Sequence, residues 1–157
     1  MGGKLAMNNN TKLLLDFTDR DFTAPHQLEL YNYWLSLRNG RKMPSRSDIQ
    51  IEQLKGYLPS IMLFDFDNNN DAFIFRLIGT YCVDLYGEQT GKSVNDFAEH
   101  EPAIERLLWC VQNQKPYYAI KNLGNIDKKY INTSFIVLPL SEDDKNVNKI
   151  LASHHFY

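Results

Sequence analysis

The chain has 157 residues, a length that suits one domain. Hydrophobic residues make up 43% and charged residues 23%, the balance of a globular protein rather than of a disordered chain. The net charge of −2 and the lack of a long apolar run argue against nucleic-acid partners and against a membrane-embedded or membrane-bound protein. Cys82 and Cys110 are too few for a disulfide framework and favour a reducing, cytoplasmic location.

Residues 1–22 are predicted to be a flexible leader, because their polar, Asn-rich start lacks the apolar segment of a secretory signal. Met7 is an alternative natural start of the chain. One domain is expected over residues 23–157, with N-terminal helices over 23–58 and a sheet-bearing core over 59–157. Because the chain stops at Tyr157, directly after an apolar run, we expect no output domain and a signal that leaves through the domain's own surface.

A helix is predicted from Pro25 to Arg38, since Thr23 and Pro25 are start signals and Gly40 is a stop signal. Its apolar residues form two neighbouring stripes, which are Leu30, Trp34 and Leu37 in one and Leu28, Tyr31 and Leu35 in the other. One sheet face covers about half of a helix, so the second stripe is expected to form a symmetric homodimer interface. The alternative is that the second stripe is covered within one subunit, by residues before Thr23 and by a short helix predicted over Ile51–Leu58.

The next segments change to strand periodicity. Pro59–Phe66 and Ala72–Gly79 are apolar and aromatic runs joined by an Asn- and Asp-rich turn, so they predict a β-hairpin. Alternation in the second strand places Phe73, Phe75 and Leu77 on one face, which we expect to face the core.

The remaining elements are short helices, one longer helix over Pro102–Gln114, and three strands over 117–124, 129–140 and 149–157. The strands do not alternate with helices along the chain. We therefore expect an α+β fold, with a five-stranded antiparallel sheet and the helices gathered together.

Several short motifs, in this order, resemble a PAS-domain family found mostly in alphaproteobacteria. They are Tyr33–Gly40 with Met43–Arg46, Leu58-Pro59, Phe75–Thr80, Leu85–Gly87 with Thr90–Lys92, and Leu138–Ser141. The resemblance spans roughly Leu28 to Leu151. It implies a stand-alone, non-enzymatic sensory or signalling module whose sheet and central helices enclose a small cavity, with a small molecule or a regulatory protein as its partner.

A cavity is expected between the hairpin and the longer helix, because the strand face meets the apolar helix stripe there. The predicted ligand-binding residues are Phe73, Phe75, Leu77, Leu85, Phe97, Leu107, Leu108, Val111 and His154. His154 shares strand parity with Ile150, Ala152 and Phe156 and so is expected to point inward. A hydrogen-bonded core histidine is the plainer interpretation of His154.

No cofactor or metal is expected. The flavin-linked Asn-Cys-Arg-Phe motif of light-sensing PAS domains is absent, and no Cys-x-x-Cys or His-x-x-x-His spacing occurs. The two cysteines have no nearby cation in the sequence and are interpreted as small core residues.

Two other functions stay open at this point. One is a small enzyme in which His154 acts as a general base with Asp65 or Tyr86 nearby. The other is an interaction module whose interior is filled by its own side chains, among them Phe73, Phe75, Phe97, Leu107 and Trp109.

Three arginines are the polar candidates for contact with an anionic ligand or partner. Arg76 lies within an apolar strand, so its charge must be paired, for example with Asp65, or must reach solvent. The alternative is that Arg38, Arg46 and Arg76 converge on a carboxylate.

Overall fold

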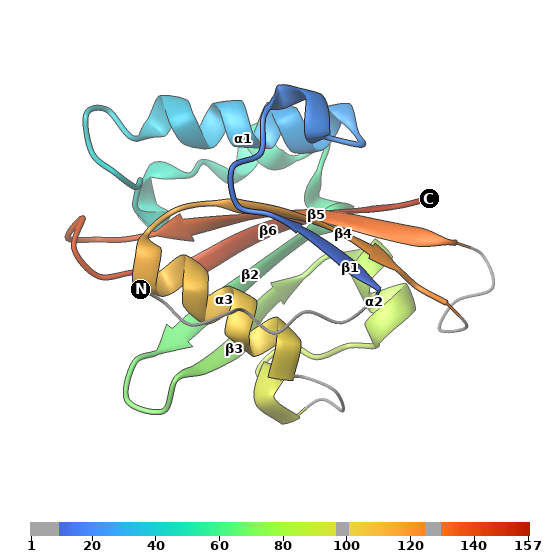
Figure 1. Ribbon diagram of the computed structural model, residues 1–157. Coiled ribbons are helices and arrows are strands. Elements are labelled where there is room, and N and C mark those ends of the chain that lie inside the picture. The colour runs from blue at the N-terminus through green and yellow to red at the C-terminus, as the bar shows by residue number, and fades with distance from the viewer. Residues whose placement is uncertain (1–9, 97–100, 125–129) are drawn as a thin grey trace.

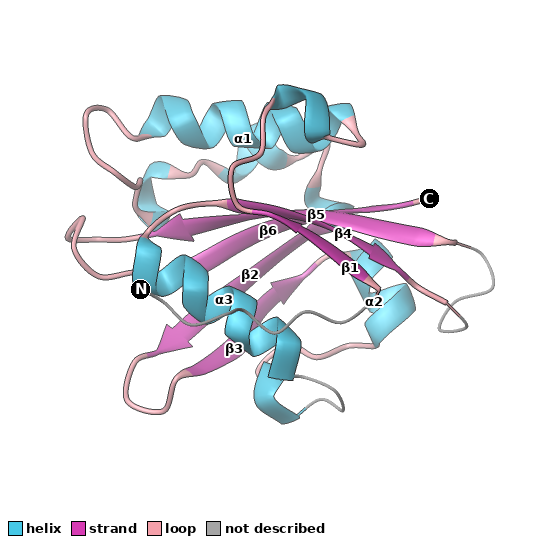
Figure 2. Ribbon diagram, viewed as in Figure 1, coloured by secondary structure: helices cyan, strands magenta, loops and turns pink. Residues whose placement is uncertain are grey.

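The computed structural model describes residues 10–96, 101–124 and 130–157. Six strands form one sheet between two helical layers (Figures 1 and 2). The strands are β1 (Thr11–Leu14), β2 (Ile61–Asp67), β3 (Ala72–Ile78), β4 (Tyr117–Asn122), β5 (Asn132–Leu140) and β6 (Lys149–Phe156). The α-helices are α1 (Pro25–Leu37), α2 (Thr80–Tyr86) and α3 (Glu101–Asn113). None of the described helices has the length and apolar character needed to cross a membrane.

The sheet has the strand order β1-β4-β5-β6-β2-β3, and every neighbouring pair is antiparallel. The α+β class and the antiparallel sheet are as expected, but the sheet has six strands rather than five. The predicted short helix over Ile51–Leu58 is two 3-10 turns, η3 (Ile51–Leu54) and η4 (Leu58–Ser60). Another 3-10 turn, η5 (Val94–Asp96), lies where a brief helix was expected.

The additional strand, β1, comes from the segment expected to be a leader. Thr11 pairs with Lys121 and Leu14 with Tyr118, and the Asn122 N–H donates to the Asn10 carbonyl at 2.7 Å. A run of four residues is too short to show strand periodicity, and its partner strand lies more than 100 residues away. The ordered domain therefore begins before residue 23.

A bulge in β3 corrects the expected face of Leu77. Phe75 pairs with Phe64 and Leu77 with Leu63, so Arg76 is an extra residue in the bulged strand. Because Leu63 and Phe64 are consecutive, they face opposite sides of the sheet. Phe73 and Phe75 thus share a face and are buried, while Leu77 aligns with Leu63 on the opposite face.

The outer face of the sheet is covered by α1. The Gln27 Nε2 donates to the carbonyls of Ser134 and Ser153, at 3.2 and 3.1 Å, and the Tyr118 hydroxyl donates to Gln27 Oε1 at 2.6 Å. The Trp34 indole N–H donates to the Pro139 carbonyl at 2.9 Å. These hydrogen bonds tie α1 to strands β4, β5 and β6.

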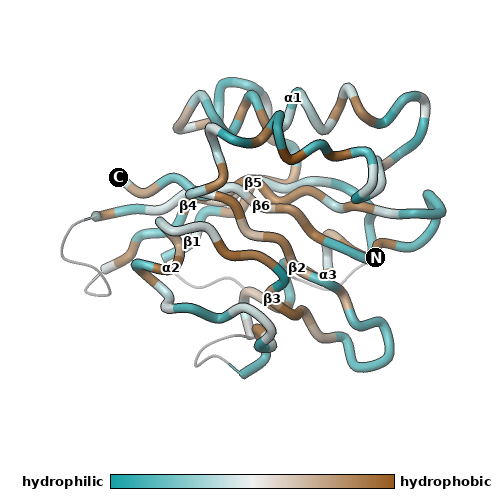
Figure 3. The backbone as a smooth tube through the Cα atoms, turned by 180° about the vertical axis from the view of Figure 1, so that it is seen from behind, coloured by the Kyte–Doolittle hydropathy of each residue, from teal (hydrophilic) through white to brown (hydrophobic). Residues whose placement is uncertain are grey.

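The inner face packs against α2, η5 and α3, which lie on the side of the sheet away from α1 (Figure 1). Trp109 of α3 contacts Tyr117 with ring centroids 6.3 Å apart, and aromatic pairs such as Phe64 and Phe75 fill the layer on the hairpin side. The central strands are largely apolar, whereas the loops that join the elements are hydrophilic (Figure 3).

Gly79 follows β3 at a place where the backbone of η4 comes very close. A Cβ at this position would lie 2.3 Å from the Leu58 carbonyl oxygen and 2.4 Å from that of Pro59. The Gly79 N–H also donates to the Ile61 carbonyl at 2.7 Å. The sequence of β3 and α2 therefore needs a glycine at their junction.

We predict that Gly79→Ala lowers the free energy of unfolding by about 1–3 kcal/mol, since main-chain atoms must shift to admit the methyl group. Urea denaturation measures this change. Gly56→Ala is the matched control, because a Cβ at Gly56 meets nothing within 4 Å. Equal stability of the two variants would contradict the prediction.

Candidate ligand-binding site

Three side chains from α3, β5 and β6 meet in the inner layer. Phe135 and His154 are paired across β5 and β6, and their rings stack with centroids 5.2 Å apart. The Arg106 guanidinium lies over the Phe135 ring, with Cζ 5.9 Å from the ring centroid. The guanidinium of Arg106, the ring of Phe135 and the imidazole of His154 therefore lie one after another in space along the inner face.

Arg106 is a charged side chain that is only 6% exposed. It lies four residues before buried Cys110 and next to buried Leu107, so the helix turns it toward the sheet. Neither Nε nor Nη1 has a hydrogen-bond partner, and among the described residues no carboxylate forms an ion pair with it. The protein itself leaves much of this guanidinium unused.

His154 is 8% exposed, and its Nδ1 also lacks a hydrogen-bond partner. The expected inward orientation is confirmed, since its ring stacks on Phe156 and makes an edge contact with Tyr86 at 6.2 Å. Burial, with a smaller contribution from the charge of Lys121, lowers the pKa of His154 to about 4. The imidazole is therefore neutral near pH 7.

The positive charge of Arg106 affects the pKa values of two nearby tyrosines, Tyr86 and Tyr117. Burial raises the pKa of Tyr86 and of Tyr117 well above the usual value, and the positive charge of Arg106 partly opposes both shifts. Both phenols stay protonated at neutral pH, so neither neutralises the guanidinium.

The predicted apolar ligand residues divide into several groups. Phe73, Phe75 and Leu107 are buried in the core, and Leu108 and Val111 pack against it half-buried. Leu85 is half-buried on α2, but its neighbour Tyr86 makes the contact with His154. Leu77 aligns with the opposite face, and Phe97 lies outside the described residues.

The enzyme hypothesis placed Asp65 or Tyr86 near His154; Tyr86 contacts its ring, whereas Asp65 lies on the other face of the sheet. It pairs with Lys149 on β6, whereas His154 has the opposite strand parity. Its carboxylate accepts hydrogen bonds from Arg76 and from the Lys149 ammonium. Burial raises the pKa of Asp65, but these two cations outweigh burial and hold it below its usual value.

The three candidate arginines have separate partners. Arg76 forms its ion pair with Asp65 at 2.6 Å, the structural alternative considered from the sequence. Arg46 donates to the Ile49 carbonyl, and Arg38 lies over the Trp34 ring at 5.3 Å. These partners lie on different elements, and no shared anion site is formed.

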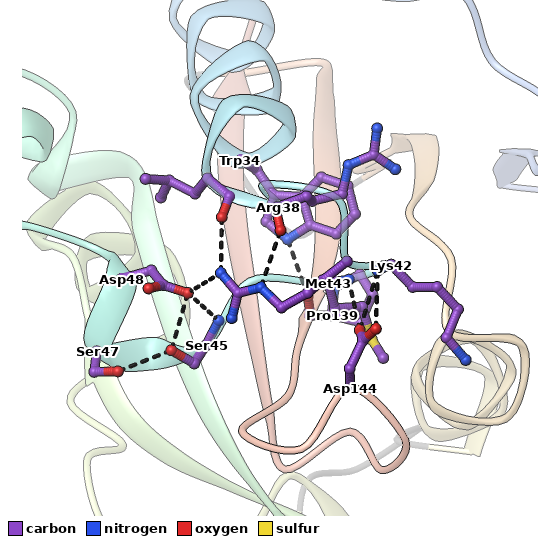
Figure 4. A network of polar contacts seen from close by, with 11 residues as sticks. Trp34, Arg38, Lys42, Met43, Ser45, Ser47, Asp48, Pro139 and Asp144 are labelled. Atoms are coloured by element: carbon purple, nitrogen blue, oxygen red, sulfur yellow. Dashed lines mark hydrogen bonds and ion pairs between the residues drawn. The ribbon is translucent and has the colours of Figure 1, made fainter.

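Polar contacts join the end of α1 to the following loop, in which Ser45 and Asp48 lie (Figure 4), and Arg41 takes part in them. Its guanidinium pairs with Asp48 at 2.7 Å and donates to the Leu37 carbonyl. Asp48 also accepts a hydrogen bond from the Ser45 backbone N–H, which together with Arg41 lowers the pKa of its carboxyl. Arg41 and Asp48 have a structural role, because their charges pair with each other.

Both cysteines are buried, as predicted for core residues. Burial raises the pKa of Cys82 to about 12 and that of Cys110 as well, so both remain thiols at neutral pH. Within the described ranges, no group of three or more His, Cys, Asp or Glu side chains could hold a metal ion.

Sequence reasoning missed Arg106, Tyr117 and Phe135. The predicted stripe of the longer helix contained only apolar residues, so nothing was predicted for Arg106. One signal was available: Arg106 precedes Cys110 by four residues and so lies on the same side of the helix.

Strand order and helix placement define the class of protein. An antiparallel sheet with short helices and one longer helix packed on its inner face is consistent with a PAS-like fold. A family model described as PAS domain matches residues 22–154, so the chain belongs to the PAS domain family. The comparisons with curated proteins and with solved structures give no significant match.

The low pKa of His154 predicts acid sensitivity. Its value is about 4 in the folded protein, against an ordinary 6.5, so between these values the unfolded chain binds more protons. The free energy of unfolding should therefore fall by about 2–3 kcal/mol between pH 7 and pH 4.5 from this group. His155, whose pKa is also lowered by burial, acts in the same direction.

Denaturation curves across this pH range test the prediction. His154→Asn should flatten the dependence, leaving the smaller part due to His155. An unchanged slope in the variant would show that His154 is not the responsible group.

Proposed function

We propose that the protein is a non-enzymatic sensory module that binds a small molecule in its inner layer and signals to a regulatory protein partner in the bacterial cytoplasm. Membership of the PAS family supports a sensory role, since such domains are generally non-enzymatic sensors. The resemblance of the chain's short motifs to stand-alone alphaproteobacterial PAS proteins supports a place in a regulatory pathway.

One observation carries the ligand part of the proposal. Arg106 Nε, Arg106 Nη1 and His154 Nδ1 are buried in one layer without hydrogen-bond partners. A buried polar group left unsatisfied costs about 1–3 kcal/mol, and more when it is charged. A ligand that bonded to these nitrogens would remove that cost.

The contacts of α1 offer a route for the signal. Ser134 and Ser153 immediately precede Phe135 and His154, and their carbonyls accept the two hydrogen bonds from Gln27. The carbonyl of His154 itself contacts His26 Nε2 at 3.0 Å. A ligand that displaces β5 or β6 on the inner face would thus move the groups that hold α1 on the outer face.

Helix α1 is also the proposed contact of a homodimer. Tyr31 packs against Phe17 and Phe22 of the same chain, with ring centroids 5.1 and 5.8 Å away, so part of the second stripe is covered internally. Leu28 and Leu35 remain half-buried beside it. A smaller contact through these two leucines is therefore proposed.

Mass spectrometry tests the binding role. Full-length protein, purified under native conditions, should show a mass excess that is lost on denaturation, with a small molecule recovered in the released fraction. His154→Ala should reduce the occupied fraction. If the native mass equals the chain mass and a broad metabolite library causes no thermal shift, the binding proposal fails.

The dimer is tested with the double variant Leu28→Glu and Leu35→Glu. Light scattering should show a dimer for the wild type and a folded monomer for the variant, because charged side chains cannot be buried across the contact. Ser36→Glu, at an exposed position of α1 about a quarter-turn away from these two leucines, is the matched control and should remain dimeric. A wild-type monomer at high micromolar concentration would contradict the proposal.

A further inference from the structure

We infer that the inner layer binds a small organic carboxylate, with Arg106 as the anchor of its negative charge. This inference rests on the proposed function and names the chemical class of its ligand. It depends on the charge, the donor geometry and the aromatic surroundings of Arg106.

The charge balance of the layer indicates an anion. A guanidinium keeps its proton at all physiological pH values, so Arg106 is a buried cation. No described carboxylate pairs with it, the nearby phenols are protonated and His154 is neutral. Burying an unpaired charge is costly, and a ligand carboxylate would convert it into an ion pair.

The free donors of Arg106 fit a planar acceptor. Nε and Nη1 lie on different edges of the guanidinium, and each edge combines one of them with Nη2, so a single carboxylate would accept from Nε or from Nη1 but not from both. A carboxylate presents two oxygens in the spacing that a guanidinium edge matches with two parallel hydrogen bonds. One unit of positive charge also suits a monocarboxylate better than a phosphate dianion.

The rest of the layer suits an apolar or aromatic body. Phe135 lies beneath the guanidinium, and His154 and Phe156 continue the stack with centroid separations of 5.2 and 5.8 Å. The unpaired Nδ1 of His154 offers one further hydrogen bond to a polar substituent. The ligand class is therefore a small, otherwise apolar carboxylate.

The alternative is a purely structural arginine, held by its contact with Phe135 and by the Tyr117 phenol. A structural Arg106 would affect stability but would not distinguish charged from neutral compounds. Paired probes of equal shape separate the two interpretations.

The experiment measures the thermal shift and the affinity of the full chain for two pairs of compounds, acetate and acetamide, and phenylacetate and phenylacetamide. Chloride serves as a control for a simple anion. At least one carboxylate should raise the Tm and bind at least tenfold more tightly than its amide. Arg106→Gln should abolish that preference, whereas Arg106→Lys should retain part of it. Arg76→Gln, which removes a surface arginine, should leave it unchanged.

Equal binding of acid and amide, equal protection by chloride, or a preference that survives in Arg106→Gln would overturn the inference. Should the Arg106 variants fail to fold, the Nε–H NMR signal of Arg106 in the wild type decides, since a bound carboxylate must shift it and the amide must not. A neutral compound found in the native mass would overturn the carboxylate class while leaving the proposed sensory function intact.

Discussion

The side chain of Gln27 links α1 to the sheet, and the position of the outer helical layer depends on this link. The side chain is fully buried, and both ends of its amide are used: Nε2 by the carbonyls of Ser134 and Ser153, and Oε1 by the Tyr118 hydroxyl. A buried amide without these partners would destabilise the fold, so the position of α1 is specified by hydrogen bonds as well as by apolar contact. The outer face can therefore carry serines and a tyrosine beneath a helix.

The polar groups of Thr23 on the outer face differ in their hydrogen bonding from those of Arg106 and His154 on the inner face. On the outer face Thr23 bonds to Ser134, Tyr118 and His155, so the buried hydroxyls there have partners. On the inner face Arg106 and His154 keep unpaired nitrogens. A buried polar network in which every group has a hydrogen-bond partner helps to specify the fold. Buried groups without partners need another explanation, and in this family a bound ligand is the one proposed above.

The periodicity of apolar residues predicted the helices and strands that neighbouring residues specify by themselves. The hairpin, α1, α3 and the three final strands followed from apolar spacing and from caps, and the inward orientation of His154 followed from strand parity. The bulge at Arg76 could not be predicted, because it depends on how β3 pairs with β2, and it moved Leu77 to the other face. β1 required a partner far along the chain, and the burial of Arg106 required the tertiary position of α3.

Both edges of the sheet are blocked against further strand addition. At one edge β1 is four residues long, which offers little backbone to a new strand. At the other edge, the N–H and carbonyl of Phe75 already bond to Lys92 and Gly91, and the charged bulge at Arg76 follows directly. Among the residues that the structure describes, neither edge therefore offers a long template for joining two sheets edge to edge, as in fibrils. The helical surfaces, such as the contact proposed for α1, would let copies associate and separate without merging two sheets.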